Sequence, residues 1–360
     1  MLNTGQAAFP RSLLAVVLLL HAPLLKAGEL HDILARSREN LGRLKWVKCV
    51  SETVYGAVKD DVDPEEAPIM NVTWPSGTDI LREAEWTPAT PISAQLWIKR
   101  GEVERFEEQR FDARIKEVNL KPNWAEPFGS ERVLSGPFQR LKLRTGDRGG
   151  NAAVWDTGDR HPYDTPFEYL GVGGGGRGLN FQALVKMVDE GKFQATIEHR
   201  KTPANEPRIR VFFQGAEPEQ DQIATWTYDL DPAHGMLPTE IRNVFSKSDR
   251  SNETRYLVRH KEVPGAGWFP VQCTAISRSD AVKHNLRSVT RSRVVTSSFE
   301  KPTDDELRVT IPQGSEIIFS VGLYSPVRGA KFSTSAEERV DIDGVADLIE
   351  RAKIKSRPSL

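Results

Sequence analysis

A series of alternating apolar and polar runs between Phe193 and Pro312 constrains the fold of this chain more than any other feature. Phe193 to His199 and Arg208 to Phe213 both alternate with a period of two, which is typical of strands that bury one face. Turn signals built from Asp-Pro, Gly, Pro and Asn/Asp separate further runs. These are Gln222 to Leu230, Glu240 to Phe245, Thr254 to Val263, Trp268 to Ser277, Leu286 to Ser297 and Glu306 to Ile311. Together they predict an antiparallel meander.

The residues before the meander predict more strands. Trp46 to Val58 reads as a first strand, and Ala94 to Phe111 as a hairpin that turns at Lys99 to Gly101. Glu131 to Arg144 and Ala152 to Asp156 predict further strands. Residues 60–91 are rich in Pro, Asp and Glu, and we expect a surface excursion with little regular structure there.

Three helices are predicted. Glu29 to Lys45 places Leu30, Ile33, Leu34, Leu41 and Leu44 on one face. Phe181, Leu184, Val185 and Val188 share one side of a second helix that stops at Gly191. Ala336 to Lys353 holds a third helical pattern. The fold class is therefore mostly β with few helices (α+β).

The N-terminus predicts a secretory signal peptide over residues 1–27. Arg11 precedes the apolar run Leu13 to Leu20, and polar sequence starts at Gly28. Cleavage after Ala27 is expected, and an uncleaved anchor stays open as the alternative. No later stretch is long and apolar enough to cross a bilayer. We therefore expect an exported protein, periplasmic or extracellular, with a soluble body.

The charge balance limits the classes of partner. Lys and Arg number 49 against 50 Asp and Glu, whereas nucleic-acid binding needs a concentrated basic surface. The glycine-rich stretch from Tyr169 to Gly178 lacks the Lys-Ser/Thr of a phosphate-binding loop, so it predicts a hinge before the second helix. We expect neither nucleic acid nor a cofactor.

The two cysteines leave two alternatives open. Cys49 and Cys273 both lie in strand-like runs, and export permits a disulfide between them. Two buried free thiols fit the same sequence.

Aromatic residues on the predicted strands either form a core or line a concave apolar wall. With the second helix as a lid, the candidate ligand-binding residues are Phe181, Leu184, Val185, Val188, Trp226, Tyr228 and Trp97.

A weaker alternative site lies just before the second helix. Asp156, Asp159, His161 and Asp164 place three carboxylates and an imidazole in one loop, which could hold a metal ion or supply acid and base groups. The spacing matches no established ligand loop, and the same residues serve ordinary turns. No catalytic residues are assigned.

The order of parts resembles the exported LolA-like family, the outer-membrane lipoprotein carriers and their relatives. Local similarities are Leu96 to Gly101, Leu230 to Pro238 and Gly265 to Pro270. The resemblance implies a large antiparallel sheet curved into an unclosed barrel, with the N-terminal and inserted helices on its concave face. It covers residues 28–312, and residues 313–360 form a C-terminal extension with a short helix. Members of that family hold acyl chains of lipoproteins or sense them as regulators of envelope stress.

The leading hypothesis is a non-enzymatic exported protein that binds a hydrophobic small molecule or acyl chain, with an envelope protein as a further candidate partner. A metal-dependent hydrolase centred on residues 156–164 and a structural envelope interaction protein are the alternatives.

Overall fold

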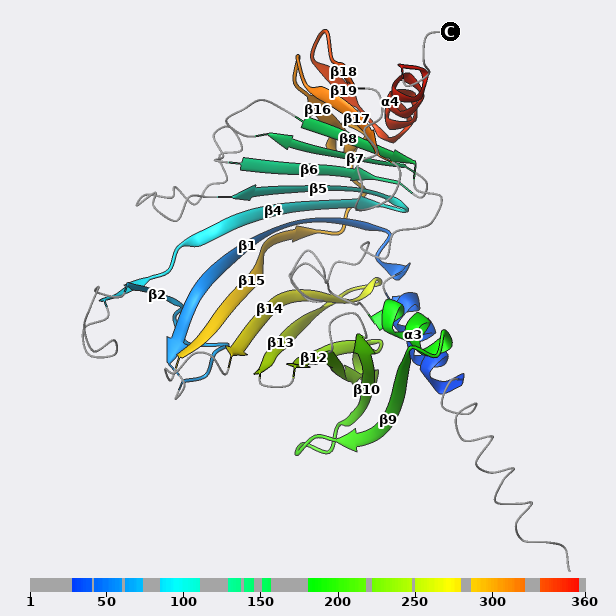
Figure 1. Cartoon of the computed structure of the whole chain (residues 1–360). Coiled ribbons are helices and arrows are strands. Elements are labelled where there is room, and N and C mark those ends of the chain that lie inside the picture. The colour runs from blue at the N-terminus through cyan, green and yellow to red at the C-terminus, as the bar shows by residue number, and fades with distance from the viewer. Residues whose placement is uncertain are drawn as a thin grey trace, which may run out of the picture.

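The computed structural model describes residues 28–40, 42–59, 62–73, 85–110, 129–136, 139–145, 151–156, 181–217, 222–247, 250–279, 286–320 and 331–355. These residues are mostly β, with three helices and one large, mostly antiparallel sheet (Figure 1). The predicted fold class is confirmed at this level. Within the described ranges, no helix has the length and apolar character that a bilayer span requires.

The N-terminal helix comprises residues 28–40 and 42–43. It leads into β1 (Trp46–Lys59), β2 (Met70–Thr73), β3 (Glu85–Pro88), β4 (Pro91–Arg100), β5 (Val103–Arg110), β6 (Gly129–Ser135), β7 (Gln139–Thr145) and β8 (Asn151–Asp156). Helix α3 (Phe181–Asp189) then precedes β9 (Phe193–Lys201), β10 (Pro207–Glu217), β11 (Gln222–Asp231), β12 (Leu237–Lys247), β13 (Arg250–Val263), β14 (Gly267–Ser279) and β15 (Leu286–Ser298). The chain continues through β16 (Val309–Ile311), β17 (Glu316–Ser320), β18 (Lys331–Ser333), β19 (Glu338–Val340) and α4 (Ile342–Lys355).

The first strand of the chain lies in the middle of the sheet. β1 pairs with β15 on one side and with β4 on the other, so it joins the meander β9 to β15 to the meander β4 to β8. Every neighbouring pair from β9 to β15 is antiparallel, which confirms the predicted meander.

Three details differ from the sequence-based expectations. The last predicted strand, Glu306 to Ile311, is shortened to β16 because residues 305–307 form a 3-10 turn, and β16 pairs with β19 in a separate two-stranded sheet. The excursion 60–91 contains two short strands, and β2 joins the end of β1 through Ala57 and Met70. Beyond Pro312 the chain returns to the main sheet, where β17 runs parallel to β8.

The helices cover opposite faces at the two ends of the sheet. The N-terminal helix and α3 share a buried apolar cluster with β9 to β14, whereas α4 packs with β6, β7, β8 and β17. Directly paired residues point to the same face of a sheet. Cys273, Ser292 and Thr53 are paired in turn, Cys49 lies four residues from Thr53 on β1, and Cys49 pairs with Trp97, so all of these residues lie on the face that the N-terminal helix and α3 cover. Ile98, next to Trp97, points to the opposite face, and its row of partners leads to Leu134 and Leu141, which belong to the cluster under α4.

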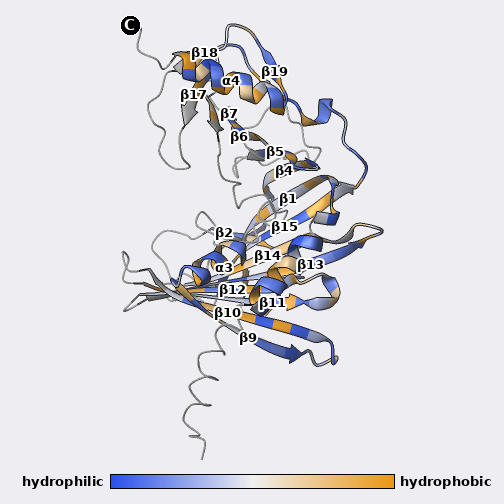
Figure 2. Cartoon of the chain, turned by 90° about the vertical axis from the view of Figure 1, so that its right-hand side faces the viewer, coloured by the Kyte–Doolittle hydropathy of each residue, from blue (hydrophilic) through white to orange (hydrophobic). Residues whose placement is uncertain are grey.

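This arrangement explains the shape of the sheet, which is neither closed nor strongly curled (Figure 1). A half-barrel curls around a single covered face, but here the covering layers lie on opposite faces at the two ends. The predicted placement of the N-terminal and inserted helices on a common face is correct, and the strong curl expected of a half-barrel is absent. Figure 2 shows hydrophobic and hydrophilic residues alternating along the strands under these two helices.

Both cysteines are buried free thiols. Cys49 pairs with Ser297 and Cys273 with Ser292, on the two sides of β15. Two strand spacings of about 4.8 Å already exceed the roughly 7 Å limit between the Cα atoms of a disulfide. Burial raises the pKa of Cys49 to about 12, and it also raises the pKa of Cys273. Of the two alternatives left open by the sequence, the structure has the free thiols.

Candidate functional site

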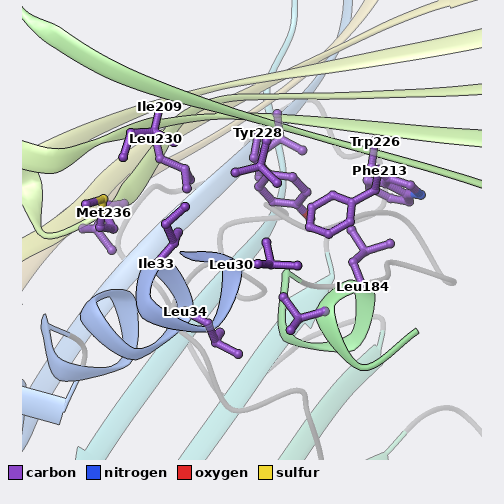
Figure 3. Close-up of a cluster of buried hydrophobic side chains, with 14 of the residues drawn as sticks. Leu30, Ile33, Leu34, Leu184, Ile209, Phe213, Trp226, Tyr228, Leu230 and Met236 are labelled. Carbon is purple, nitrogen blue, oxygen red and sulfur yellow. The ribbon is translucent and has the colours of Figure 1, made fainter. Parts of the chain in front are cut away.

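Six of the seven candidate residues come together in one cluster. Leu184 and Val185 of α3 are buried, Phe181 and Val188 of the same helix are partly buried, and β11 contributes Trp226 and Tyr228 (Figure 3). The N-terminal helix completes the cluster with Leu30, Ile33 and Leu34. Two helices therefore cover one apolar face of the sheet.

The wall of this site is a row of cross-strand partners. Phe213, Trp226 and Asn243 face one another in register on β10, β11 and β12. One pair further along, Val211, Tyr228, Ile241 and Tyr256 do the same across four strands. Period-two alternation in each strand puts all of these side chains on the helix-covered face. Tyr228 is 3% exposed, and its burial raises the pKa of its hydroxyl.

Helix α3 closes over this wall through its first residue. The Phe181 ring meets the rings of Phe213 and Tyr228 edge to face, with centroids 5.5 and 5.1 Å apart. At the other end, Gly191 adopts a φ of 72° and donates its N–H to Val188, while Lys192 donates to Met187. This is a Schellman ending, and it confirms the predicted stop at Gly191.

Polar contacts join the two helices and the edge strand. His31 Nε2 lies 3.0 Å from Asp189 Oδ1 and so links the N-terminal helix to the end of α3. His199 Nε2 of β9 lies 2.7 Å from Glu29 Oε1 of the N-terminal helix. Both pairs are substantially exposed, so each contributes little to stability.

Two buried polar atoms in the wall have no hydrogen-bond partner in the structure. Trp226 Nε1 and Asn243 Oδ1 belong to directly paired residues that are 1% and 6% exposed. Leaving a donor and an acceptor unmade in a buried site costs about 1–3 kcal/mol each. Such atoms are where a polar group of a ligand gains most.

Trp97 lies outside this site. It is on β4, six strands from β11 in the order of the sheet, which is roughly 25–30 Å at 4.8 Å per strand. Its ring stacks on Phe269 at 6.3 Å, and Nε1 donates to Glu104 Oε2 at 3.4 Å. It belongs to a second cluster with Leu44, Val47 and Cys49.

The alternative loop site falls largely outside the described residues. Asp159, His161 and Asp164 are not described, nor is the glycine-rich stretch expected to act as a hinge, and Asp156 ends β8. Among the residues that are described, no group of three or more His, Cys, Asp and Glu side chains is arranged to hold a metal ion.

A buried polar cluster beside the apolar face was not anticipated. Asp231, 1% exposed, accepts a hydrogen bond from the Ala233 N–H, and its Oδ2 lies 3.0 Å from both Arg208 and His234 Nδ1. The His234 ring lies against the Trp268 ring, with centroids 3.6 Å apart and the ring planes tilted by 31°. Nearby His260 has its pKa lowered to about 4, first by burial and second by His234. The only sequence signal for this cluster was the Asp-Pro-Ala-His turn.

Asn40 was also missed, because it reads as an exposed helix residue. Asn40 is 4% exposed and forms two hydrogen bonds with the main chain of Trp268: its Oδ1 accepts from the N–H and its Nδ2 donates to the carbonyl, both at 3.1 Å. Asn40 thereby fixes the end of the N-terminal helix to the first residues of β14.

No protein-family model matches this chain, and no curated protein is significantly similar to it. Among solved structures, a chain of the complex structure of Pseudomonas aeruginosa MucA/MucB is similar over 74% of this chain and 94% of its own length. The identity is 7% and the TM-score is 0.22. The resemblance to the LolA-like family therefore stays a prediction from the sequence.

Proposed function

We propose that this chain binds a hydrophobic ligand of the acyl-chain class between the strand wall Phe213, Trp226 and Tyr228 and helix α3, which acts as a displaceable lid. The observation that carries the proposal is an aromatic face that is covered, beside the N-terminal helix, by α3, a helix of only nine residues. Export and a relation to the LolA-like acyl-chain carriers belong to the same proposal and derive from the signal-like N-terminus and the order of elements in the sequence.

The energies favour a chain over a small molecule. Displacing α3 uncovers Leu184 and Val185 fully and Phe181, Met187 and Val188 in part, at about 5–10 kcal/mol by the usual 1.5–3 kcal/mol per fully buried side chain and half of that for a partly buried one. Burying a methylene returns about 0.8 kcal/mol. Burying a chain of six carbons therefore releases less free energy than displacing α3 costs, whereas burying a chain of fourteen carbons releases more. Binding is expected to show a threshold in chain length.

The unpartnered atoms support the same site. Trp226 Nε1 offers a donor and Asn243 Oδ1 an acceptor in an otherwise apolar wall. A few polar groups in an apolar pocket are typical of sites that orient a small ligand. Neither alternative function is carried by an observation on the described residues.

Native mass spectrometry of the full-length protein with fatty alcohols of six to sixteen carbons tests the proposal. Wild type is expected to bind one long chain and no short chain. Leu184→Ala loosens the lid and, because the ligand then displaces a weaker contact, tightens long-chain binding by roughly 10- to 100-fold, equivalent to about 1.4–2.8 kcal/mol.

Leu348→Ala is the matched control. Leu348 is a leucine on α4, 1% exposed, in the cluster at the other end of the sheet. Its truncation costs a similar amount of stability and should leave chain affinity unchanged. Equal effects of the two substitutions, or no saturable chain binding in wild type, would overturn the proposal.

A further inference from the structure

An open pocket of about 500 Å³ lies at the C-terminal end of the N-terminal helix. Three segments meet there: the last helical turn, the turn between β11 and β12, and the turn between β13 and β14. Asn40 holds them together. Gly235 and Gly267 approach its side chain so closely, at φ values of 67° and 88°, that a Cβ on either would lie 2.7 or 2.5 Å from it.

The floor of the pocket is continuous with the apolar layer under the helices. Met236 lines the pocket, is 4% exposed and belongs to the same buried cluster as Leu230 and Tyr228. Trp268 also lines the pocket and packs against that cluster. Figure 3 shows Met236 next to Ile33 and Leu230, on the side of the N-terminal helix away from Leu184. The pocket thus adjoins the layer in which the chain is proposed to lie, with the Met236 side chain between them.

The mouth carries one unengaged charge of each sign. Arg43 is paired with Glu39 at 2.6 Å, but Arg36 and Glu262, both exposed lining residues, form no ion pair in the described structure. The helix also ends here, and the carbonyl groups of a last turn attract positive charge. A ligand that presents an anion to Arg36 and an ammonium group to Glu262 matches both charges.

We propose that this pocket binds the zwitterionic head group of an amphiphile, an ammonium together with a phosphate, whose acyl chain enters the apolar layer past Met236. The inference rests on the proposed function for the chain, and adds a head-group specificity to it. The volume is within the range usual for small-ligand sites.

Four probes separate head from chain: C14 lysophosphatidylethanolamine, C14 lysophosphatidylglycerol, 1-tetradecanol and free phosphoethanolamine. Each is titrated into the full-length protein, the two lysophospholipids below their micelle concentrations. Wild type is expected to prefer the ethanolamine over the glycerol lipid by about tenfold. Glu262→Gln should remove that preference, and Arg36→Gln should weaken both phospholipids about tenfold. Neither substitution should change tetradecanol binding.

Arg38→Gln is the matched control, because Arg38 is exposed on the same helix and does not line the pocket. Tetradecanol binding without any preference between the two lipids overturns the head-group inference and leaves the chain-binding function standing. Failure of tetradecanol and both lipids overturns the function itself. Binding of free phosphoethanolamine alone, dependent on Glu262, overturns the amphiphile and assigns the pocket to a soluble zwitterion.

Discussion

The double hydrogen bond between Asn40 and Trp268 makes a quantitative prediction about how the N-terminal helix is held. Asn40→Ala removes both 3.1 Å bonds and leaves the N–H and carbonyl of Trp268 without these partners. Both hydrogen bonds are part-buried, so leaving each main-chain group unpaired costs about 1–2 kcal/mol, the lower part of the usual range, and alanine's better helix propensity returns about 0.5 kcal/mol. We expect a loss of about 1.5–3.5 kcal/mol in the free energy of unfolding.

Asn40→Asp separates hydrogen bonding from packing. Aspartate has nearly the same shape, but it replaces the donating Nδ2 by an oxygen that faces the Trp268 carbonyl and places a negative charge at a helix C-terminus. It should therefore cost at least as much as alanine. Urea denaturation at pH 7 measures both variants, and Arg38→Ala, on the exposed side of the helix, should stay within about 0.5 kcal/mol of wild type. An Asn40→Asp protein as stable as wild type would refute the double hydrogen bond as the connection between helix and sheet.

Three further predictions follow from other residues. The pKa of His260 is lowered to about 4 from an ordinary 6.5, so the unfolded chain binds a proton more readily than the folded one. The stability that neutral His260 contributes is therefore complete above pH 6.5 and is lost as the pH falls to 4, by at most about 3 kcal/mol. Urea titrations of wild type and His260→Gln across this pH range measure the loss, and parallel pH profiles of the two proteins would contradict it. Gly191→Ala should lower the stability of α3 by about 1–2 kcal/mol, because a Cβ at this position meets no other atom and only the φ of 72° is unfavourable. Hydrogen exchange of the α3 amides measures this loss, and an unchanged exchange rate would argue against it. Cys49 and Cys273 should not react with a thiol reagent in the native protein, because burial raises the pKa of both thiols, and both should react in guanidinium. Fast reaction of either thiol in the native protein would show that burial does not protect it.

Local patterns explain the part of the fold that could be predicted. The strands β9 to β15 alternate with a period of two and follow one another closely in the sequence, so both their existence and their pairing follow from neighbouring residues. Helix α3 was predictable for the same reason, since its apolar spacing and Gly191 lie within one short segment.

Non-local pairing explains most of what was missed. No residue near Trp46 signals that β1 lies between β15 and β4 in the sheet. The alternating pattern of β4 therefore predicts that Trp97 is buried on one face, but it does not predict how far Trp97 lies from Trp226. The parallel pairing of β17 with β8 joins residues 165 positions apart, such as Glu316 and Asn151. Asn40 looks like a surface residue until two glycine turns, at Gly235 and Gly267, close around it.

Photo-crosslinking with a sixteen-carbon fatty acid that carries a diazirine in its chain tests the central claim most directly. Mass spectrometry of the digested full-length protein locates the label. Saturable labelling of α3 and of the strands that carry Phe213, Trp226 and Tyr228, competed away by unlabelled fatty acid, is the predicted result. Labelling that is not saturable, or that concentrates on α4 and β6 to β8 at the other end of the sheet, would contradict it.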